Sequence, residues 1–213
     1  MTIHTIAIFD TETTGLPVAK ASYQSPQQPH IMQLATMLID DVGNSLKKFN
    51  RLIKPEGYTR VDEGAFNAHG ISFEKAMDEG IPRKEVFDEW RELTRDSVLL
   101  VGHNVSFDRR LLDINMWRTY HHLNQSYRSK PTFCTMHSYT KQVKLPATAK
   151  MKQYGFGPYK APTLQELHQF LFGEPFDKAH DAMADVEACA KAFLVHPDRP
   201  SIKNILSQPQ KLR

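Results

Sequence analysis

A short apolar segment near the N-terminus, residues 5–10 (TIAIFD), constrains the possible folds more than any other feature of the chain. It is rich in β-forming residues and is followed by threonine, glycine and proline, which is typical of a core strand that ends in a loop. Two acidic residues, Asp10 and Glu12, stand at the tip of this expected strand. The sequence therefore predicts a pair of carboxylates at one edge of a sheet.

The remaining strand patterns come first along the chain and then alternate with helical patterns. Residues 31–40 and 48–53 are expected to form strands joined through a turn at residues 42–44, which predicts an antiparallel meander. Further buried strands are expected at residues 98–102 and 132–136. This order indicates an α/β fold with a mixed sheet covered by helices.

The expected helices are marked by capping residues and by apolar residues at helical spacing. They are expected at residues 72–77, from 82, from 106, at 163–171 and at 181–194. Ser72, Ser106 and Asp181 stand where N-caps should be, and Pro82 begins a helix. Asp108 then falls in the first turn of the helix that Ser106 caps.

Composition excludes several classes of protein. A chain of 213 residues with 40% hydrophobic content favours one domain, here residues 1–196, followed by a peripheral tail at 197–213. Cys134 and Cys189 are too few for a disulfide framework or a thiolate zinc site, and we expect both to be reduced and buried. With no apolar run of roughly 20 residues and no signal segment, we expect a soluble, cytoplasmic protein without a membrane partner. The net charge of +3 permits a polyanionic partner without requiring one.

Two connections are polar and long. Residues 17–29 form one, and residues 144–162 mix lysine, glycine, proline and aromatic residues without clear periodicity. In the second connection, three lysines would attract phosphate groups and three aromatic rings would stack on bases. These residues are Lys150, Lys152, Lys160, Tyr154, Phe156 and Tyr159. A solvated loop with partly buried rings is the alternative interpretation of this connection.

Asp10 and Glu12 are two apart, so in a strand they point the same way, with Cα atoms roughly 6.5 to 7 Å apart. Such paired hard oxygens suit Mg²⁺ or Mn²⁺ better than zinc. Taken alone, however, this D-x-E pattern is more typical of a polar turn that closes a strand. The position of Asp108, taken alone, is likewise explained by the favourable interaction of a carboxylate in a first helical turn with the helix dipole.

His180 and Asp185 are five residues apart, which on one helix places them about 140° from each other. They can share a site only if His180 lies in a loop before the helix that Asp181 caps and folds back beside Asp185. The alternatives are a surface histidine and a solvated helix face.

Three motifs that occur in order along the chain favour a shared site over these separate explanations. They are FDTETTGL at residues 9–16, GHNVSFD at 102–108 and HDAMADVEA at 180–188. Together they resemble the DEDDh exonucleases, the DnaQ-like 3′-5′ group, over residues 6–194. A further element, NAHGIS at residues 67–72, resembles a family loop near the bound 3′ nucleotide. The resemblance implies a ribonuclease H-like fold, a five-stranded mixed sheet flanked by helices with the acidic cluster at one edge.

The resemblance also implies the catalytic roles. Two Mg²⁺ or Mn²⁺ ions would be held by four carboxylates, with Asp10 shared between them. Glu12 and Asp185 would complete the site of the attacking water, and Asp108 would help to hold the second ion. His180 would remove the proton of that water, a task that suits an imidazole.

Contacts to the terminal nucleotide are expected from residues around these motifs. They are Thr11, Thr13, Gly15, Leu16, His69, Asn104 and Phe107. His69 alone is also explained by local packing, and Phe107 by the core. The expected reaction is release of nucleoside 5′-monophosphates from nucleic-acid 3′ ends. Single-stranded DNA is favoured over RNA, and a homodimer or a polymerase is a possible partner.

Two other readings compete with this one. A haloacid-dehalogenase-like phosphatase also begins with a strand that ends in F-D-x-D, but Glu12 is one methylene longer than that chemistry expects. A non-catalytic, polymerase-associated nucleic-acid-binding module would be favoured by the loss of one carboxylate. All five expected catalytic positions are occupied, which favours an enzyme.

Overall fold

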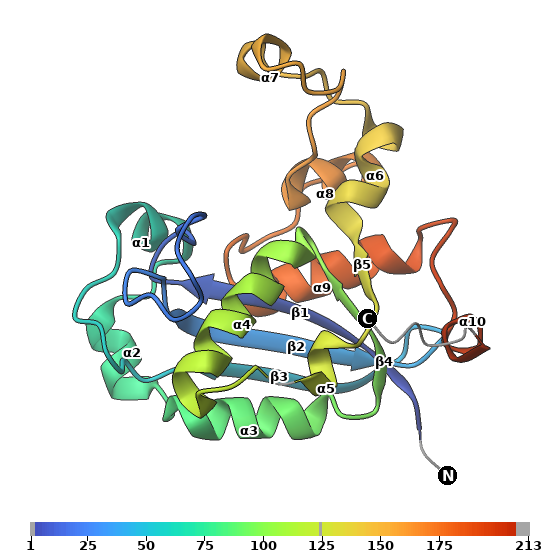
Figure 1. The fold of residues 1–213 in the computed structure, drawn as a ribbon. Coiled ribbons are helices and arrows are strands. Elements are labelled where there is room, and N and C mark those ends of the chain that lie inside the picture. The colour runs from blue at the N-terminus through green and yellow to red at the C-terminus, as the bar shows by residue number, and fades with distance from the viewer. Residues whose placement is uncertain (1–2, 124, 208–213) are drawn as a thin grey trace.

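A single mixed sheet forms the centre of the molecule (Figure 1). The computed structural model describes residues 3–123 and 125–207. The strands are β1 (Thr5–Thr13), β2 (Ile31–Ile39), β3 (Ser45–Leu52), β4 (Ser97–Gly102) and β5 (Thr132–Cys134), in the order β3-β2-β1-β4-β5. β2 runs antiparallel to β1 and β3, whereas β4 is parallel to β1 and β5. The expected five-stranded mixed sheet is confirmed.

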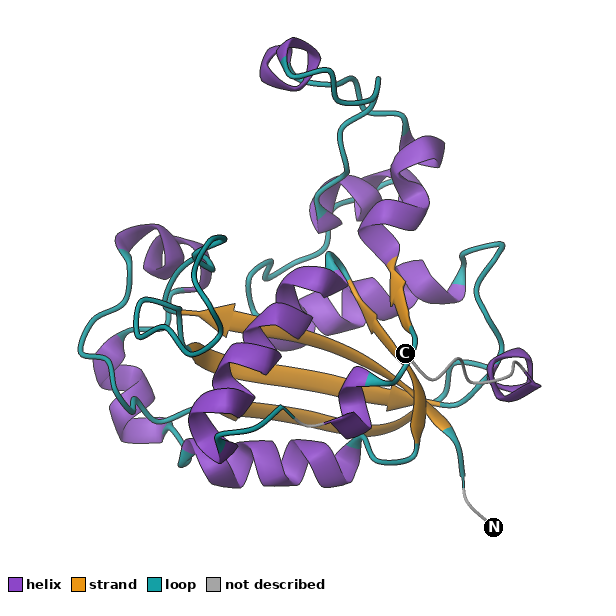
Figure 2. Cartoon of the chain, viewed as in Figure 1, coloured by secondary structure: helices purple, strands orange, loops and turns teal. Residues whose placement is uncertain are grey.

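Helices cover both faces of this sheet (Figure 2). They are α1 (Glu63–His69), α2 (Phe73–Glu79), α3 (Arg83–Leu93), α4 (Val105–Tyr120), α5 (Gln125–Arg128), α6 (Thr135–Val143), α7 (Ala149–Gln153), α8 (Leu164–Phe172), α9 (Ala182–Leu194) and α10 (Ile202–Ser207). None of the helices in the described part of the chain combines the length and apolar character that a bilayer crossing needs.

The alternation of side chains along β1 divides the core into two layers. Ala7 and Phe9 point to the side of α3 and α4, where Trp90 is fully buried. Ile6 and Ile8 point to the other side and pack beneath α9. Because both faces of β1 are covered, the strand is apolar at successive positions, as the segment TIAIFD predicted.

Four of the expected helix starts are confirmed: Pro82 directly precedes α3, and the other three have capping side chains. Ser72 accepts a hydrogen bond from the Lys75 N–H, and Asp181 accepts from two N–H groups at the start of α9. Thr163 forms a reciprocal capping box with Glu166. These caps satisfy amide groups that the helix itself leaves without partners.

Other boundaries were wrong. Asn104, with a left-handed φ of 69°, is the N-cap of α4, so Ser106 lies inside the helix instead of capping it. β5 ends at Cys134, and Met136 belongs to α6. β1 continues to Thr13, so Asp10 and Glu12 lie within the strand. Cys189 is buried as expected but Cys134 is only half-buried, and neither forms a disulfide.

The C-terminal segment packs on the core through α10. Ile202 and Ile205 contact the apolar layer under α9, and the Ile202 N–H donates to Asp41 Oδ1 at 2.9 Å. Residues 208–213 of the expected tail lie outside the described residues.

Candidate active site

The candidate site lies where β1 extends past its parallel neighbour. Pairing between β1 and β4 ends at Ile8 and Val101, so the rest of β1 has an open edge on that side. α4 follows β4 directly and places Asp108 against this edge. Asp108 Oδ1 accepts hydrogen bonds from the Thr11 N–H at 3.1 Å and from Thr11 Oγ1 at 2.7 Å. The carboxylate thereby replaces the missing strand as the partner of a buried amide.

Asp10 and Glu12 continue the face of β1 that carries Ile6 and Ile8, because residues two apart share a face. That face is covered by α9, whose first turn contains Asp185. The strand and the helix thus bring three carboxylates together from distant parts of the sequence.

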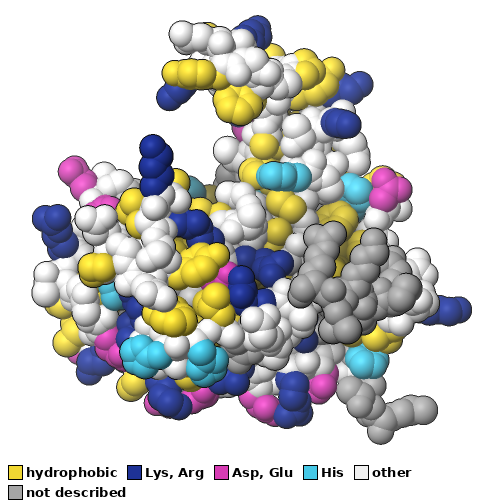
Figure 3. Space-filling model, viewed as in Figure 1, with side chains coloured by type: hydrophobic (Ala, Val, Ile, Leu, Met, Phe, Trp, Pro, Cys, Tyr) yellow, Lys and Arg dark blue, Asp and Glu magenta, His cyan; other side chains and the backbone are white. Residues whose placement is uncertain are grey.

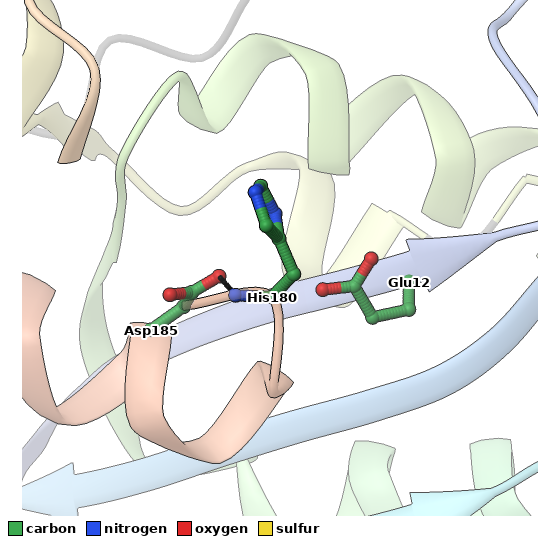
Figure 4. A group of neighbouring side chains, drawn as sticks. All are labelled: Glu12, His180 and Asp185. Carbon is green, nitrogen blue, oxygen red and sulfur yellow. Dashed lines mark hydrogen bonds between the residues drawn. The ribbon is translucent and has the colours of Figure 1, made fainter. Parts of the chain in front are cut away.

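His180 lies in the loop before α9, as the sequence argument required. It adopts a left-handed φ of 68°, and its N–H donates to Asp185 Oδ2 at 3.2 Å. Figure 4 shows the side chains of Glu12, His180 and Asp185 together, from strand, loop and helix. Each of the three offers a ligand atom, and these atoms all lie within 4.8 Å of one another.

Burial is the largest cause that raises the pKa of each of the four carboxylates, and neighbouring carboxylate charges raise it further. The pKa of Glu12 rises to about 8, that of Asp108 to about 7 and that of Asp185 to about 6. Burial, followed by the charges of Asp108, Glu12 and Asp185, raises the pKa of Asp10 well above its ordinary value. The cluster therefore holds more negative charge than the fold itself stabilises.

Among the described residues, only His180 offsets part of this charge, by lowering the pKa of Asp185 against the larger effect of burial. No lysine or arginine in residues 3–123 and 125–207 forms an ion pair with any of the four carboxylates. The donor set, carboxylate oxygens with one imidazole, suits hard divalent cations. The residues present therefore fit the metal ions that the sequence predicted.

The end of β1 carries three of the residues expected to contact substrate. Thr13 Oγ1 donates to the Gly15 carbonyl at 2.8 Å, and Leu16 is 80% exposed just beyond. Gly15 passes so close to Asp62 that a Cβ atom would lie 2.2 Å from Asp62 Oδ2. A larger residue at this position would require the exposed side chain of Asp62 to move.

His69 reaches the same strand end from α1. Its Nε2 donates to the Thr13 carbonyl at 3.0 Å, and its Nδ1 accepts from the Ile71 N–H at 3.0 Å. Burial lowers the pKa of His69, which favours the neutral ring that this pair of bonds needs. Both ring nitrogens are engaged within the protein, so a substrate contact would use the face of the ring.

Of the other residues expected to contact substrate, Thr11 is buried and its hydroxyl donates a hydrogen bond to Asp108. Asn104 makes the turn from β4 into α4, and its Oδ1 accepts from Ser106 Oγ at 3.3 Å. Phe107 is half-buried and packs against the apolar layer under α3 and α4.

A cavity of about 310 Å³ opens beside His180. It is lined by Gln33, Leu52, Ala68, His69, Ile71, Lys75, Lys178, Ala179, His180 and Asp181. Lys75 and Lys178 bring positive charge to this lining, in which Asp181 is the one acidic residue, an arrangement that suits a phosphate-bearing ligand.

Sequence reasoning did not assign His103, the residue between Gly102 and Asn104 in the second motif. Its Nε2 donates to the Pro162 carbonyl at 3.0 Å, and its Nδ1 accepts from Thr135 Oγ1 at 3.0 Å. Burial lowers the pKa of His103 to about 4, so the ring is neutral. His103 thus ties the start of α4 to two later segments.

The hydrogen bonds between Thr11 and Asp108 give a testable expectation. Thr11→Val removes the shorter bond and should lower kcat/KM about tenfold to a hundredfold, because a bond to a charged group is worth about 1.5–3 kcal/mol. The metal concentration needed for half-maximal activity should rise as well. Thr11→Ser, which keeps the hydroxyl, is the matched control. Equal kinetics in all three proteins would show that this bond does not position Asp108.

The fold is that of ribonuclease H-like nucleases. A family model described as exonuclease (RNase_T) matches residues 7–193, so the chain belongs to this exonuclease family. Comparison with curated protein sequences finds no match.

Solved structures of exonuclease I share the fold. The complex of the Escherichia coli enzyme with a dA16 oligonucleotide is 19% identical, with a TM-score of 0.70, and the match covers 92% of this chain and 41% of that chain. A zinc-bound complex of the same enzyme with single-stranded DNA is 20% identical, with a TM-score of 0.66, covering 90% and 40%. Exonuclease I from Methylocaldum szegediense is 20% identical, with a TM-score of 0.65, covering 89% and 39%. The chain thus spans about 41% of the length of the first of these structures.

Proposed function

We propose that this protein is a divalent-metal-dependent 3′-5′ exonuclease that releases nucleoside 5′-monophosphates from single-stranded DNA. The observation that carries the proposal is the convergence of Asp10, Glu12, Asp108 and Asp185 beside His180, with no lysine or arginine ion pair to these carboxylates among the described residues. Membership of the exonuclease family supports the reaction class. The DNA oligonucleotides bound in the exonuclease I structures support the substrate class.

Hydrolysis of a phosphodiester needs an activated water, stabilisation of the added negative charge and help for the leaving 3′ oxygen. Two Mg²⁺ or Mn²⁺ ions would supply Lewis-acid stabilisation of that charge. Asp10 would be a ligand of both ions, Glu12 and Asp185 would help to hold the ion of the attacking water, and Asp108 would help to hold the second ion.

His180 is proposed as the general base. It accepts a proton from the water whose oxygen forms the new bond to phosphorus. The bond from phosphorus to the 3′ oxygen breaks, and that oxygen takes up a proton from solvent to become the new 3′ hydroxyl, while His180 releases its proton to solvent. The products are a nucleoside 5′-monophosphate and a strand shorter by one nucleotide.

The terminal nucleotide is proposed to occupy the cavity beside His180. Lys75 and Lys178 at its rim would attract the phosphate, and the exposed side chain of Leu16 offers an apolar contact to the terminal base. The ring face of His69, together with Asn104 and Phe107, would complete the contacts.

End-labelled substrates test the proposal. A 5′-labelled single-stranded DNA should shorten stepwise from its 3′ end in Mg²⁺ or Mn²⁺ and stay intact in EDTA. Matched RNA and hairpin DNA, run in parallel, measure the sugar and strand preference; faster trimming of RNA would assign an exoribonuclease of the same family. Cleavage of circular DNA, shortening from the 5′ end, or release of inorganic phosphate from small phosphoesters would each contradict the proposed reaction.

A further inference from the structure

Residues 144–162, here called the arm, project from the body of the protein between α6 and α8 (Figure 1). Two hydrogen bonds close its stem, from the Ala147 N–H to the Pro158 carbonyl at 2.9 Å and from the Lys160 N–H to the Leu145 carbonyl at 2.9 Å. The tip, residues 148–157, contains α7 and is held by its own local hydrogen bonds. The arm is therefore a defined hairpin-like structure.

The tip exposes large aromatic side chains that are not part of the apolar core. Tyr154 is 66% exposed and Phe156 is 64% exposed. Every tip residue is exposed except the half-buried Met151, and none of the apolar clusters formed by the described residues includes a residue of the tip. Two neighbouring aromatic rings left in solvent indicate a surface that contacts another molecule.

The charge of this region has one sign. From Lys141 to Lys160 the sequence contains five lysines and no acidic residue. Lys160 pairs with Glu166, whereas Lys150 and Lys152 beside the two exposed rings form no ion pair within the described residues. Figure 3 shows hydrophobic and basic side chains gathered at the end of the arm.

The base of the arm is joined to the segment that precedes α4. The Pro162 carbonyl accepts the hydrogen bond from His103 Nε2, one residue before Asn104 and five before Asp108. On the other side of Pro162, α8 leads into the loop that carries His180. The base of the arm is therefore bonded to the turn that leads into α4 and on to Asp108, while the tip projects outward (Figure 1).

We propose that the arm binds single-stranded nucleic acid upstream of the 3′ end and guides the strand to the acidic cluster. Tyr154 and Phe156 stack on bases, and Lys150 and Lys152 neutralise phosphates. Stacking on exposed rings together with backbone charge is how proteins hold single strands without reading their sequence. This inference rests on the proposed function, because it assumes that the occupant of the acidic cluster is a nucleic-acid end.

Charge favours a nucleic acid over a protein or a second copy of this chain as the occupant. The region from Lys141 to Lys160 is uniformly basic, and this chain carries a net charge of +3, so copies of it would repel one another at this surface. A polyanionic strand matches both the charge and the rings.

Binding measured in EDTA tests the arm separately from hydrolysis. The probe is a fluorescein-labelled dT20 strand, added to the whole protein and followed by fluorescence anisotropy. The double variant Tyr154→Ala, Phe156→Ala should weaken binding about fivefold to a hundredfold for each stacked base lost. The double variant Lys150→Ala, Lys152→Ala should lower the slope of log K against log salt by about 1.4, since each phosphate contact to a single strand contributes about 0.7.

A charge-matched control comes from lysines remote from the arm. Lys47→Ala, Lys203→Ala removes the same charge from two exposed positions and should leave the salt slope unchanged. Melting temperatures of the arm variants should equal that of the wild type, because the tip lies outside the apolar clusters. Unaltered dT20 binding by both arm variants would overturn the proposal. So would a dimer of the wild-type protein in solution that the aromatic variant converts to monomer.

Substrate length gives a second, kinetic readout. With Mn²⁺ present, the arm variants should cut a 20-mer with at least a tenfold higher KM but cut a dinucleotide like the wild type, because a dinucleotide is too short to reach the tip. Equal losses on both substrates would contradict a guiding role. If the wild type hydrolyses neither substrate but the arm variants bind dT20 more weakly than the wild type does, the proposed function is contradicted and the proposed binding surface is supported.

Discussion

Replacing Asp10 with asparagine is expected to abolish metal-dependent hydrolysis and, at the same time, to stabilise the metal-free protein. Asp10 is the proposed shared ligand, and losing several kcal/mol of charge stabilisation in the transition state lowers turnover by about 10³-fold or more. Without metal, the Asp10 charge is unfavourable because burial and the charges of Asp108, Glu12 and Asp185 raise its pKa. Each kcal/mol recovered by the neutral amide raises Tm by about 2–4 °C in a protein of this size.

The pH dependence of Tm tests whether the carboxylate charges destabilise the metal-free protein. The folded pKa values of Asp185, Asp108 and Glu12, about 6, 7 and 8, lie above those of the unfolded chain, near 4. Their contribution to stability is complete below about pH 4 and is lost as the pH rises through these values. In EDTA, Tm should therefore fall between pH 5 and 8. Mg²⁺ or Mn²⁺ should restore it, and by more at pH 8 than at pH 5.

The control for Asp10→Asn is Asp78→Asn, which neutralises an exposed carboxylate on α2. It should change neither activity nor the metal-dependent rise in Tm. A metal-free Asp10→Asn protein that melts below the wild type, or one that keeps Mg²⁺-dependent turnover, would contradict the electrostatic account of the cluster.

The sheet was predictable because its signals are local. Apolar runs such as residues 5–10 bury both faces, and Ser72 and Asp181 cap helices through contacts within four residues. α1 and α7 gave no such signal, since neither contains a buried residue and so neither needs apolar periodicity. Ser106 was misplaced as a cap because the turn before α4 is made by the backbone of Asn104 instead of a capping side chain.

The types of side chain in the candidate site were predictable from the sequence, but several contacts between them were not. The loop position of His180 followed from its spacing to Asp185, because one continuous helix separates the two side chains. The bonds from Thr11 to Asp108 depend on where β4 ends relative to β1, which only the register of the sheet decides. Likewise, the hydrogen bond of His69 to the Thr13 carbonyl joins segments 56 residues apart.

His180→Ala is expected to lower kcat by about 10² to 10⁴, the usual contribution of a general base, with little change in the affinity for a nucleic-acid end. His180 is exposed and contributes no apolar packing, so the variant should fold and melt like the wild type. Added imidazole should restore part of the activity, because the loss leaves room for a diffusible base at the same position. Single-turnover kinetics on a labelled strand, with and without imidazole, measure both effects.

The geometry also allows a second role for His180, and metal titration separates the two. His180 offers a nitrogen within 4.8 Å of ligand atoms of Glu12 and Asp185, so it is placed either to take a proton or to bind an ion directly. As a base, its loss lowers kcat at saturating Mn²⁺ without changing the Mn²⁺ concentration that gives half-maximal activity. As a ligand, its loss shifts that concentration upward, and excess Mn²⁺ instead of imidazole restores turnover. His122→Ala, at an exposed histidine after α4, should alter neither parameter.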